Sequence, residues 1–110
     1  MSKSELEKKW LGNFILFGEN RYPKPLAEQR FHESRKWRFD YCFPDNMIAI
    51  EIEGGQWIKG GHTSGIGLQR DCEKYNAAQF LGWKVFRFST SMIDESKYYA
   101  DLYKLLPVIR

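Results

Sequence analysis

Residues 37–43, Trp-Arg-Phe-Asp-Tyr-Cys-Phe, and residues 47–53, Met-Ile-Ala-Ile-Glu-Ile-Glu, decide the fold that we expect for this chain. Both segments are rich in aromatic and β-branched residues, which favours strands. Between them lies Pro-Asp-Asn at 44–46. Proline presets φ, and Asp and Asn tolerate the left-handed backbone region, so these residues indicate a turn. The two segments therefore predict an antiparallel hairpin.

A two-residue loop at 45–46 would set the register of this hairpin. In that register six apolar side chains share one face: Phe39, Tyr41, Phe43, Ile48, Ile50 and Ile52. On the other face Asp40 lies opposite Glu51, and Arg38 lies opposite Glu53. Like charges directly opposed on a sheet are destabilising, so the two acids require a compensating charge. A divalent cation would supply it; a salt-bridged face, with Arg38 pairing with Glu53 and Asp40, is the alternative.

Length and composition predict a single domain, residues 1–110, with 43% hydrophobic residues to form its core. No apolar run approaches the roughly 20 residues that a membrane-spanning helix needs, and segment 14–17 is too short for the core of a signal peptide. We therefore expect a cytoplasmic protein without a membrane partner. Cys42 and Cys72 lack the CxxC spacing of structural zinc sites and are expected to be buried free thiols.

Helical spacing and turn signals predict the remaining elements. A helix begins near Ser4, where Ser4 and Glu7 match a capping box, and it ends at 18–20. The other predicted elements are a short strand at 27–32, a helix at 68–81, a strand at 83–88 and a helix at 91–105. The order α-β-β-β-α-β-α predicts an α/β (mixed α+β) protein with a central mixed four-stranded sheet flanked by helices.

The net charge of +3 is modest but unevenly distributed. Between residues 21 and 38, six basic residues stand against two acidic ones, a net charge of +4, and this segment leads directly to Asp40. A cationic surface beside carboxylates favours a polyanionic ligand such as nucleic acid, whereas a solvated surface segment is the alternative.

Six motifs follow one another along the chain: Glu-Gln-Arg-Phe-His at 28–32, Arg-Lys-Trp-Arg-Phe-Asp at 35–40, Ala-Ile-Glu-Ile-Glu-Gly-Gly at 49–55, Gly-Gly-His-Thr at 60–63, Asp-Cys-Glu-Lys-Tyr-Asn at 71–76 and Leu-Gly-Trp-Lys-Val-Phe-Arg-Phe at 81–88. The ordered set resembles the PD-(D/E)xK nucleases. Its nearest branch is the small stand-alone endonucleases related to very-short-patch repair enzymes, often carried by phages and bacteria. The resemblance implies a restriction-endonuclease-like core and a Mg²⁺- or Mn²⁺-dependent DNA endonuclease that hydrolyses phosphodiester bonds.

The resemblance also implies roles for particular residues. Asp40 is similar to the metal-binding Asp of the second strand, and Glu51 to the acidic residue of the (D/E)xK element. The Ile52 carbonyl would then be a backbone metal ligand. Glu53 stands where the family has lysine. Because Glu53 supplies no cation, it is expected to be a further metal ligand or a base for water.

The missing lysine is then expected on the helix that follows, where Lys74 is the candidate; an exposed lysine paired with Asp71 is the alternative. Glu28 resembles the upstream acidic residue that several branches use as an extra metal ligand, or else it pairs with a nearby arginine. The residues expected to bind nucleic acid are Arg30, Arg35, Lys36, Arg38, Lys59, His62 and Arg70. Contacts of this kind position a phosphate backbone without reading sequence.

Three functions remain open at this point. The first is an endonuclease that cuts duplex, nicked or branched DNA. A chain of 110 residues has no room for a separate specificity domain, so it would read DNA shape, act as a homodimer or use partner proteins. The second is a non-catalytic nucleic-acid-binding module that retains the nuclease fold. The third is a small interaction domain whose acidic residues pair with arginines.

Overall fold

The computed structural model describes residues 1–53 and 65–110. The elements in this part of the chain are α1 (Lys3–Phe17), β1 (Leu26–Arg30), β2 (Arg38–Phe43), a 3₁₀ turn (Pro44–Asn46), β3 (Ile48–Glu53), α2 (Gly65–Phe80), β4 (Lys84–Ser89), two further 3₁₀ turns (Thr90–Met92 and Ser96–Tyr99) and α3 (Ala100–Lys104). The predicted order α-β-β-β-α-β-α is confirmed.

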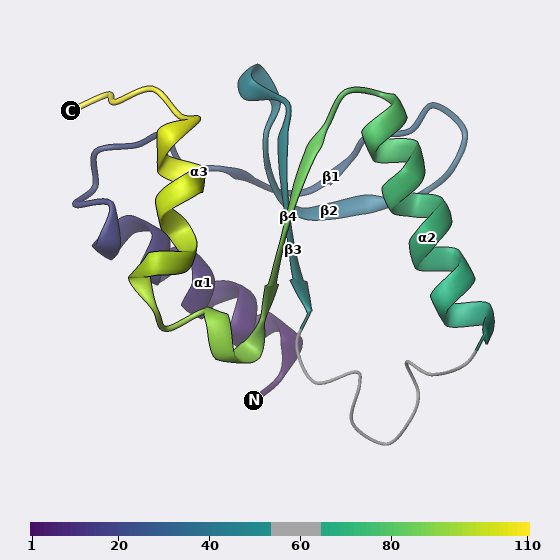
Figure 1. Ribbon diagram of the computed structural model, residues 1–110, viewed down its shortest axis with the longest axis horizontal. Helices are drawn as coiled ribbons and strands as arrows, with labels where there is room; N and C mark the ends of the chain where they lie inside the picture. The colour runs from purple at the N-terminus through teal and green to yellow at the C-terminus, as the bar shows by residue number, and fades with distance from the viewer. Residues whose placement is uncertain (54–64) are drawn as a thin grey trace.

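The four strands form one mixed sheet in the order β1-β2-β3-β4. β1 and β2 are antiparallel, as are β2 and β3, whereas β4 is parallel to β3. Helices α1 and α3 cover one face of the sheet, and α2 lies on the other side (Figure 1). The predicted central mixed sheet flanked by helices is therefore confirmed, and both sides of β3 are accessible to helical side chains.

The predicted register of the hairpin is confirmed, because Tyr41 pairs with Ile50 and Phe43 with Ile48. The turn, however, is longer than two residues. Residues 44–46 form a 3₁₀ turn, and Met47 follows in the left-handed conformation with φ 54°. The left-handed residue closes the loop without changing the register.

One of the six apolar side chains does not lie where the alternation predicts. Phe39 packs with Cys42 and Ala49 in a small cluster on the α2 side, where Ala78 is also buried. Tyr41, in contrast, belongs to the large core on the side of α1 and α3. The alternation of β2 is therefore interrupted at Asp40, the residue between Phe39 and Tyr41.

Three local predictions need correction. The cap of α1 is Ser2, whose side chain accepts from the Glu5 N–H at 3.1 Å, so Ser4 and Glu7 do not form the capping box. The predicted helix at 91–105 consists of two 3₁₀ turns and the short α3. Of the two free thiols, Cys42 is buried as expected, but Cys72 is exposed. Among the described residues no helix is long and apolar enough to cross a membrane.

Trp10 lies at the centre of the large core and is 0% exposed. Its ring lies 5.2 Å from those of Phe14 and Tyr41 and 5.8 Å from that of Tyr99, measured between centroids. Aromatic rings at these separations add to the stability provided by burial. These contacts hold α1 against β2 and thereby fix the position of its first turn.

The end of α1 offers a test of this packing. A Cβ atom at Gly18 would lie 2.9 Å from side-chain atoms of both Tyr22 and Tyr103. We expect Gly18→Ala to lower the free energy of unfolding by about 1–3 kcal/mol, the usual cost of overpacking. Gly12→Ala is the control, because a Cβ there meets nothing within 4 Å. It should raise stability by about 0.5–1 kcal/mol. Urea unfolding measures both, and equal effects would contradict the described packing.

Candidate active site

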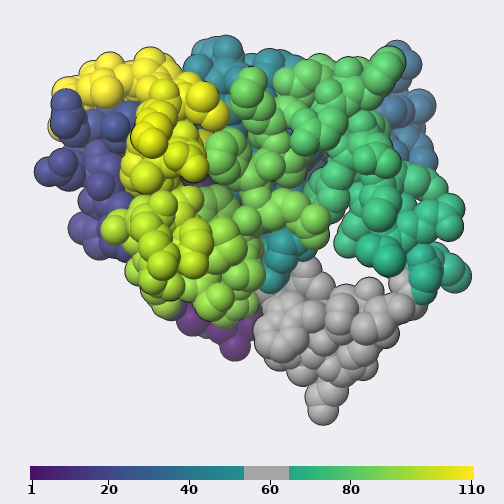
Figure 2. Space-filling view, in the orientation of Figure 1, coloured from purple at the N-terminus to yellow at the C-terminus, as the bar shows by residue number. Residues whose placement is uncertain are grey.

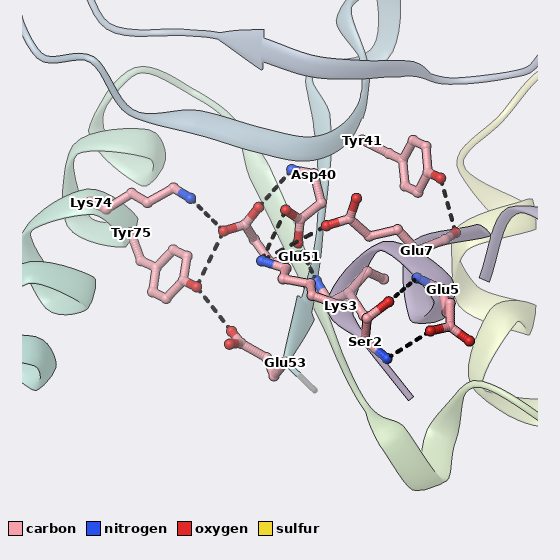
Figure 3. A network of polar contacts seen from close by, with 11 residues as sticks. Ser2, Lys3, Glu5, Glu7, Asp40, Tyr41, Glu51, Glu53, Lys74 and Tyr75 are labelled. Atoms are coloured by element: carbon pink, nitrogen blue, oxygen red, sulfur yellow. Dashed lines mark hydrogen bonds and ion pairs between the residues drawn. The ribbon is translucent and has the colours of Figure 1, made fainter. Parts of the chain in front are cut away.

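Asp40 and Glu51 link the ends of β2 and β3 through their side chains. The Asp40 N–H donates to Glu51 Oε2 at 2.9 Å, and the Ile52 N–H donates to Asp40 Oδ2 at 2.7 Å. Both acids are buried, with exposed fractions of 7% and 4%. Buried carboxylates are costly unless they accept hydrogen bonds, and here main-chain donors supply them. The predicted pair of acids is thus brought together where the alternation of β2 breaks (Figure 3).

Lys74 and Tyr75 approach Glu51 from α2 (Figure 3). The Lys74 Nζ lies 2.5 Å from Glu51 Oε1, and the Lys74 side chain is only 16% exposed. The Tyr75 hydroxyl lies 3.3 Å from Glu51 Oε1 and 2.9 Å from Glu53 Oε2. The lysine sought on the helix after the third strand therefore contacts the predicted acidic residue, and it pairs with Glu51 rather than with Asp71.

Glu53 pairs with Tyr75 and Arg87 and not with Arg38, the partner considered from the sequence. Its Oε2 accepts from Arg87 Nε at 2.6 Å and from the Tyr75 hydroxyl. Arg38 was expected opposite Glu53, but the pairing of β2 with β3 extends only from Phe43–Ile48 to Tyr41–Ile50. Lys3, Lys74 and Arg87 instead form ion pairs with Asp40, Glu51 and Glu53, respectively.

A second group of acids surrounds Asp40 from two other elements. Oxygens of Glu7, Glu28 and Asp40 all lie within 4.8 Å of one another. Glu28 is on β1, next to the position of Asp40 on β2, but the two residues do not pair although their neighbours do. Its φ is 55°, a left-handed conformation that costs about 1–3 kcal/mol in a residue other than glycine. The structure thus brings Glu28 close to Asp40, and its role as a further metal ligand stays a prediction.

Glu7 and Lys3 of α1 were missed by the sequence analysis. Lys3 Nζ lies 3.2 Å from Asp40 Oδ1 and 4.0 Å from Glu7 Oε2. Residues 3, 7 and 10 share one face of a helix, and Trp10 on that face is buried. That spacing could have indicated that Lys3 and Glu7 face the sheet, but Glu7 was assigned to a capping box with Ser4.

Burial and neighbouring charges shift the pKa values of the acids. Burial raises the pKa of Glu51 above its usual value; the nearby Asp40 raises it further, and Lys74 opposes the shift. The pKa of Glu7 is raised by burial and by the charges of Asp40 and Glu28. Burial together with Glu51 and Glu53 raises the pKa of Tyr75 far above its usual range, so its hydroxyl remains a donor at neutral pH.

Glu51, Lys74 and Tyr75 border an open cleft of about 440 Å³ between α2 and the end of β3. Figure 2 shows the molecular surface hollowed at this place. The lining residues are Lys3, Glu51, Ile52, Glu53, Asp71, Lys74 and Tyr75. Ile52, whose carbonyl is predicted to serve as a metal ligand, is therefore one of the residues that line this cleft.

Four of the seven residues predicted to bind nucleic acid form two groups. Arg30 and Arg38 are exposed and directly opposed in the β1–β2 pairing. Arg35 and Arg70 line a smaller hollow of about 230 Å³ beside α2. The Arg35 guanidinium lies 4.0 Å from the centre of the Trp37 ring. Lys36 is exposed, whereas Lys59 and His62 lie outside the described residues.

The arrangement joins hard oxygen donors to two ammonium groups in one cleft. Carboxylate oxygens are the ligands that Mg²⁺ and Mn²⁺ prefer. Acidic groups also gather in proteins without a metal. The acids therefore meet the chemical requirement for a divalent ion, but they do not identify one by themselves.

Comparisons with known proteins give few relatives. Two uncharacterized proteins of Mycobacterium tuberculosis, from strains CDC 1551 and H37Rv, are each 31% identical to this chain over 65 residues. The match covers 56% of this chain but only 22% of each mycobacterial protein, so the chain spans about a fifth of their length. No family model and no solved structure matches the chain.

The contact between Lys74 and Glu51 predicts how the acid titrates. Replacing Lys74 with methionine removes the positive charge that opposes the shift, so the pKa of Glu51 should rise further in Lys74→Met. Lys74→Arg keeps the positive charge and should change the pKa of Glu51 little. Carbon-13 NMR of labelled glutamate side chains against pH measures both. An unchanged Glu51 pKa in Lys74→Met would show that the two groups do not interact in solution.

Proposed function

We propose that this chain is a metal-dependent DNA endonuclease with a restriction-endonuclease-like core of the PD-(D/E)xK kind. One observation carries the proposal: Lys74 reaches Glu51 from α2, beside the Asp40 carboxylate bound to β3. Two acids and a lysine thus lie next to one another although Glu53 occupies the lysine position of the motif. The four-stranded mixed sheet with helices on both faces is compatible with this core.

The acids around Asp40 fit a Mg²⁺ or Mn²⁺ ion. Asp40 would hold it with Glu28, and Glu7 lies beside them. The resemblance adds Glu51 and the Ile52 carbonyl as ligands, and both residues are hydrogen-bonded to Asp40, Glu51 through its Oε2 and Ile52 through its N–H. When bound, such an ion lowers the pKa of water and polarises phosphoryl oxygens. The left-handed backbone of Glu28 supports this assignment, because strained residues cluster at functional sites.

The remaining residues of the cleft have distinct roles in this proposal. Lys74 keeps a positive charge at Glu51, where it stabilises negative charge that develops on a phosphodiester. Tyr75 stays protonated and shares its one hydroxyl proton between the nearer Glu53 and the more distant Glu51, so it helps to position both carboxylates. Glu53 accepts hydrogen bonds from Tyr75 and Arg87. These contacts favour a role in which Glu53 positions its neighbours over one in which it removes a proton from water.

The opposed arginines of β1 and β2 support DNA as the substrate. Like charges directly opposed across strands repel each other, and a phosphate group between Arg30 and Arg38 would offset that repulsion. Arg38 is two residues from Asp40, about 7 Å along the strand. A DNA backbone held by this pair would lie next to the acids. Duplex, nicked and branched DNA all present such a backbone, and a homodimer would cut both strands of a duplex.

Cleavage is tested by nicking of supercoiled plasmid in Mg²⁺ or Mn²⁺. Asp40→Asn, Glu51→Gln and Lys74→Met should each lower the rate by roughly 100-fold or more, as expected when charge stabilisation at a reacting centre is lost. Lys97→Gln changes an exposed residue that pairs with exposed Glu95 and is the control. Circular dichroism checks that each variant folds.

The outcome separates the competing functions. DNA binding without cleavage under either divalent ion would favour the non-catalytic module that retains the fold. Neither binding nor cleavage would favour a small interaction domain whose acids are paired by Lys3, Lys74 and Arg87.

The arginine pair gives a separate prediction about affinity. Replacing Arg30 and Arg38 together by glutamine should weaken binding to duplexes of different sequence by similar factors. The slope of log affinity against log salt should fall by about 2, because each lost phosphate contact releases about one counterion fewer. Lys104→Gln removes an exposed charge on α3 and serves as the control. Fluorescence anisotropy in metal-free buffer measures binding without cleavage; an unchanged slope would exclude contacts from this pair.

A further inference from the structure

The first turn of α1 places a lysine against the acids of the cleft. Lys3 Nζ lies 3.2 Å from Asp40 Oδ1, and the Lys3 side chain is 53% exposed whereas that of Asp40 is 9% exposed. Figure 3 shows the Lys3 nitrogen among the side chains of Asp40, Glu51 and Glu7. A flexible, half-exposed side chain therefore brings a positive charge to a buried carboxylate.

The position of this ammonium group follows from the charges around it. Three carboxylates, those of Glu7, Glu28 and Asp40, have oxygens within 4.8 Å of one another, and their mutual repulsion has to be offset. Lys74 is engaged with Glu51 on the other side of the cleft. Among the salt bridges of the described residues, Asp40 has Lys3 as its partner.

We propose that Lys3 is a tethered counter-ion that neutralises the acids around Asp40 in the metal-free protein and leaves when a divalent cation binds. This inference rests on the proposed function, because it concerns the same acids, and it adds a residue that sets their affinity for the ion. Lys3 competes with the ion for Asp40 Oδ1 and repels it. The metal affinity of the site is therefore lower than its carboxylates alone would give.

Only the side chain has to move in this exchange. The backbone at Lys3 is held by the capping box of Ser2 and Glu5, and the helix is held by Trp10, which is fully buried. The Lys3 stem has several rotatable bonds and is half exposed, so a change of rotamer takes the ammonium group into water. Binding of an ion therefore leaves α1 in place.

The test is the affinity of the full chain for Mn²⁺ alone, measured by calorimetry in the absence of DNA. Lys3→Gln should bind Mn²⁺ roughly three- to tenfold more tightly than the wild type, because a repelling charge a few Å from the ion is removed. Lys3→Arg keeps the charge and should retain the wild-type affinity. Lys8→Gln removes the same charge from an exposed position of α1 and should also change little, which controls for net charge.

Thermal unfolding gives a second readout. Without metal, Lys3→Gln should melt at a lower temperature than the wild type, because the repulsion among the acids is no longer offset. Saturating Mn²⁺ should remove most of that difference, since the ion then supplies the missing charge. A melting temperature that stays equally depressed with and without Mn²⁺ would show a purely structural role for Lys3 and overturn the inference.

The outcomes separate this inference from the proposed function. Wild type that binds Mn²⁺ with the same affinity as Lys3→Gln, or more tightly, overturns the inference while leaving the proposed metal site intact. Absence of Mn²⁺ binding in the wild type and all variants overturns both. Tighter binding in Lys3→Gln but not in Lys3→Arg or Lys8→Gln supports a charge that competes with the ion at this position.

Discussion

The candidate site depends on two reciprocal hydrogen bonds, in which one acid from β2 and one from β3 each accept from the main chain of the other strand. Glu51 accepts from the Asp40 N–H, and Asp40 accepts from the Ile52 N–H. These bonds meet the requirement of two buried carboxylates for donors, and they hold the strands together where the main-chain pairing ends at Tyr41 and Ile50. The place where the β2–β3 pairing ends is therefore also the place where the two acids are held.

Positive charge reaches this feature from three elements distant in the sequence. Lys3 comes from α1, Lys74 from α2 and Arg87 from β4. An isolated pair of opposed carboxylates on a sheet would be destabilising, and each of these cations offsets part of that cost. The helices on the two faces thus differ in how much they bury. Helix α1 packs three side chains into the large aromatic core and supplies Lys3, whereas α2 supplies Lys74 and has Ala78 as its buried residue.

The sequence predicts what depends on local periodicity and turn chemistry. The hairpin register was predicted from alternation and a two-residue loop at 45–46, and the register is confirmed although the turn is longer. No local pattern in the sequence indicates the interruption at Asp40, where main-chain N–H groups donate to carboxylates of the neighbouring strand. The predicted alternation therefore placed Phe39 on the wrong face of the sheet. Glu7 was misassigned because Ser4-x-x-Glu7 and Ser2-x-x-Glu5 fit one capping pattern, and only the geometry of the helix start separates them. Lys74 was identified through a resemblance, since its contact with Glu51 joins residues 23 positions apart.

A lysine supplied by a helix differs physically from one supplied by the strand itself. A lysine at position 53 would be fixed to Glu51 by the strand, whatever the helices do. Lys74 instead depends on the attachment of α2, in which Ala78 is the buried residue. Because Lys74 and Ala78 are four residues apart, they share the face of α2 that meets the sheet, whereas Ile66 and Leu68 near its start are 75% and 61% exposed. The lysine therefore sits beside the helix's point of attachment, and whatever shifts α2 on the sheet moves the positive charge away from Glu51.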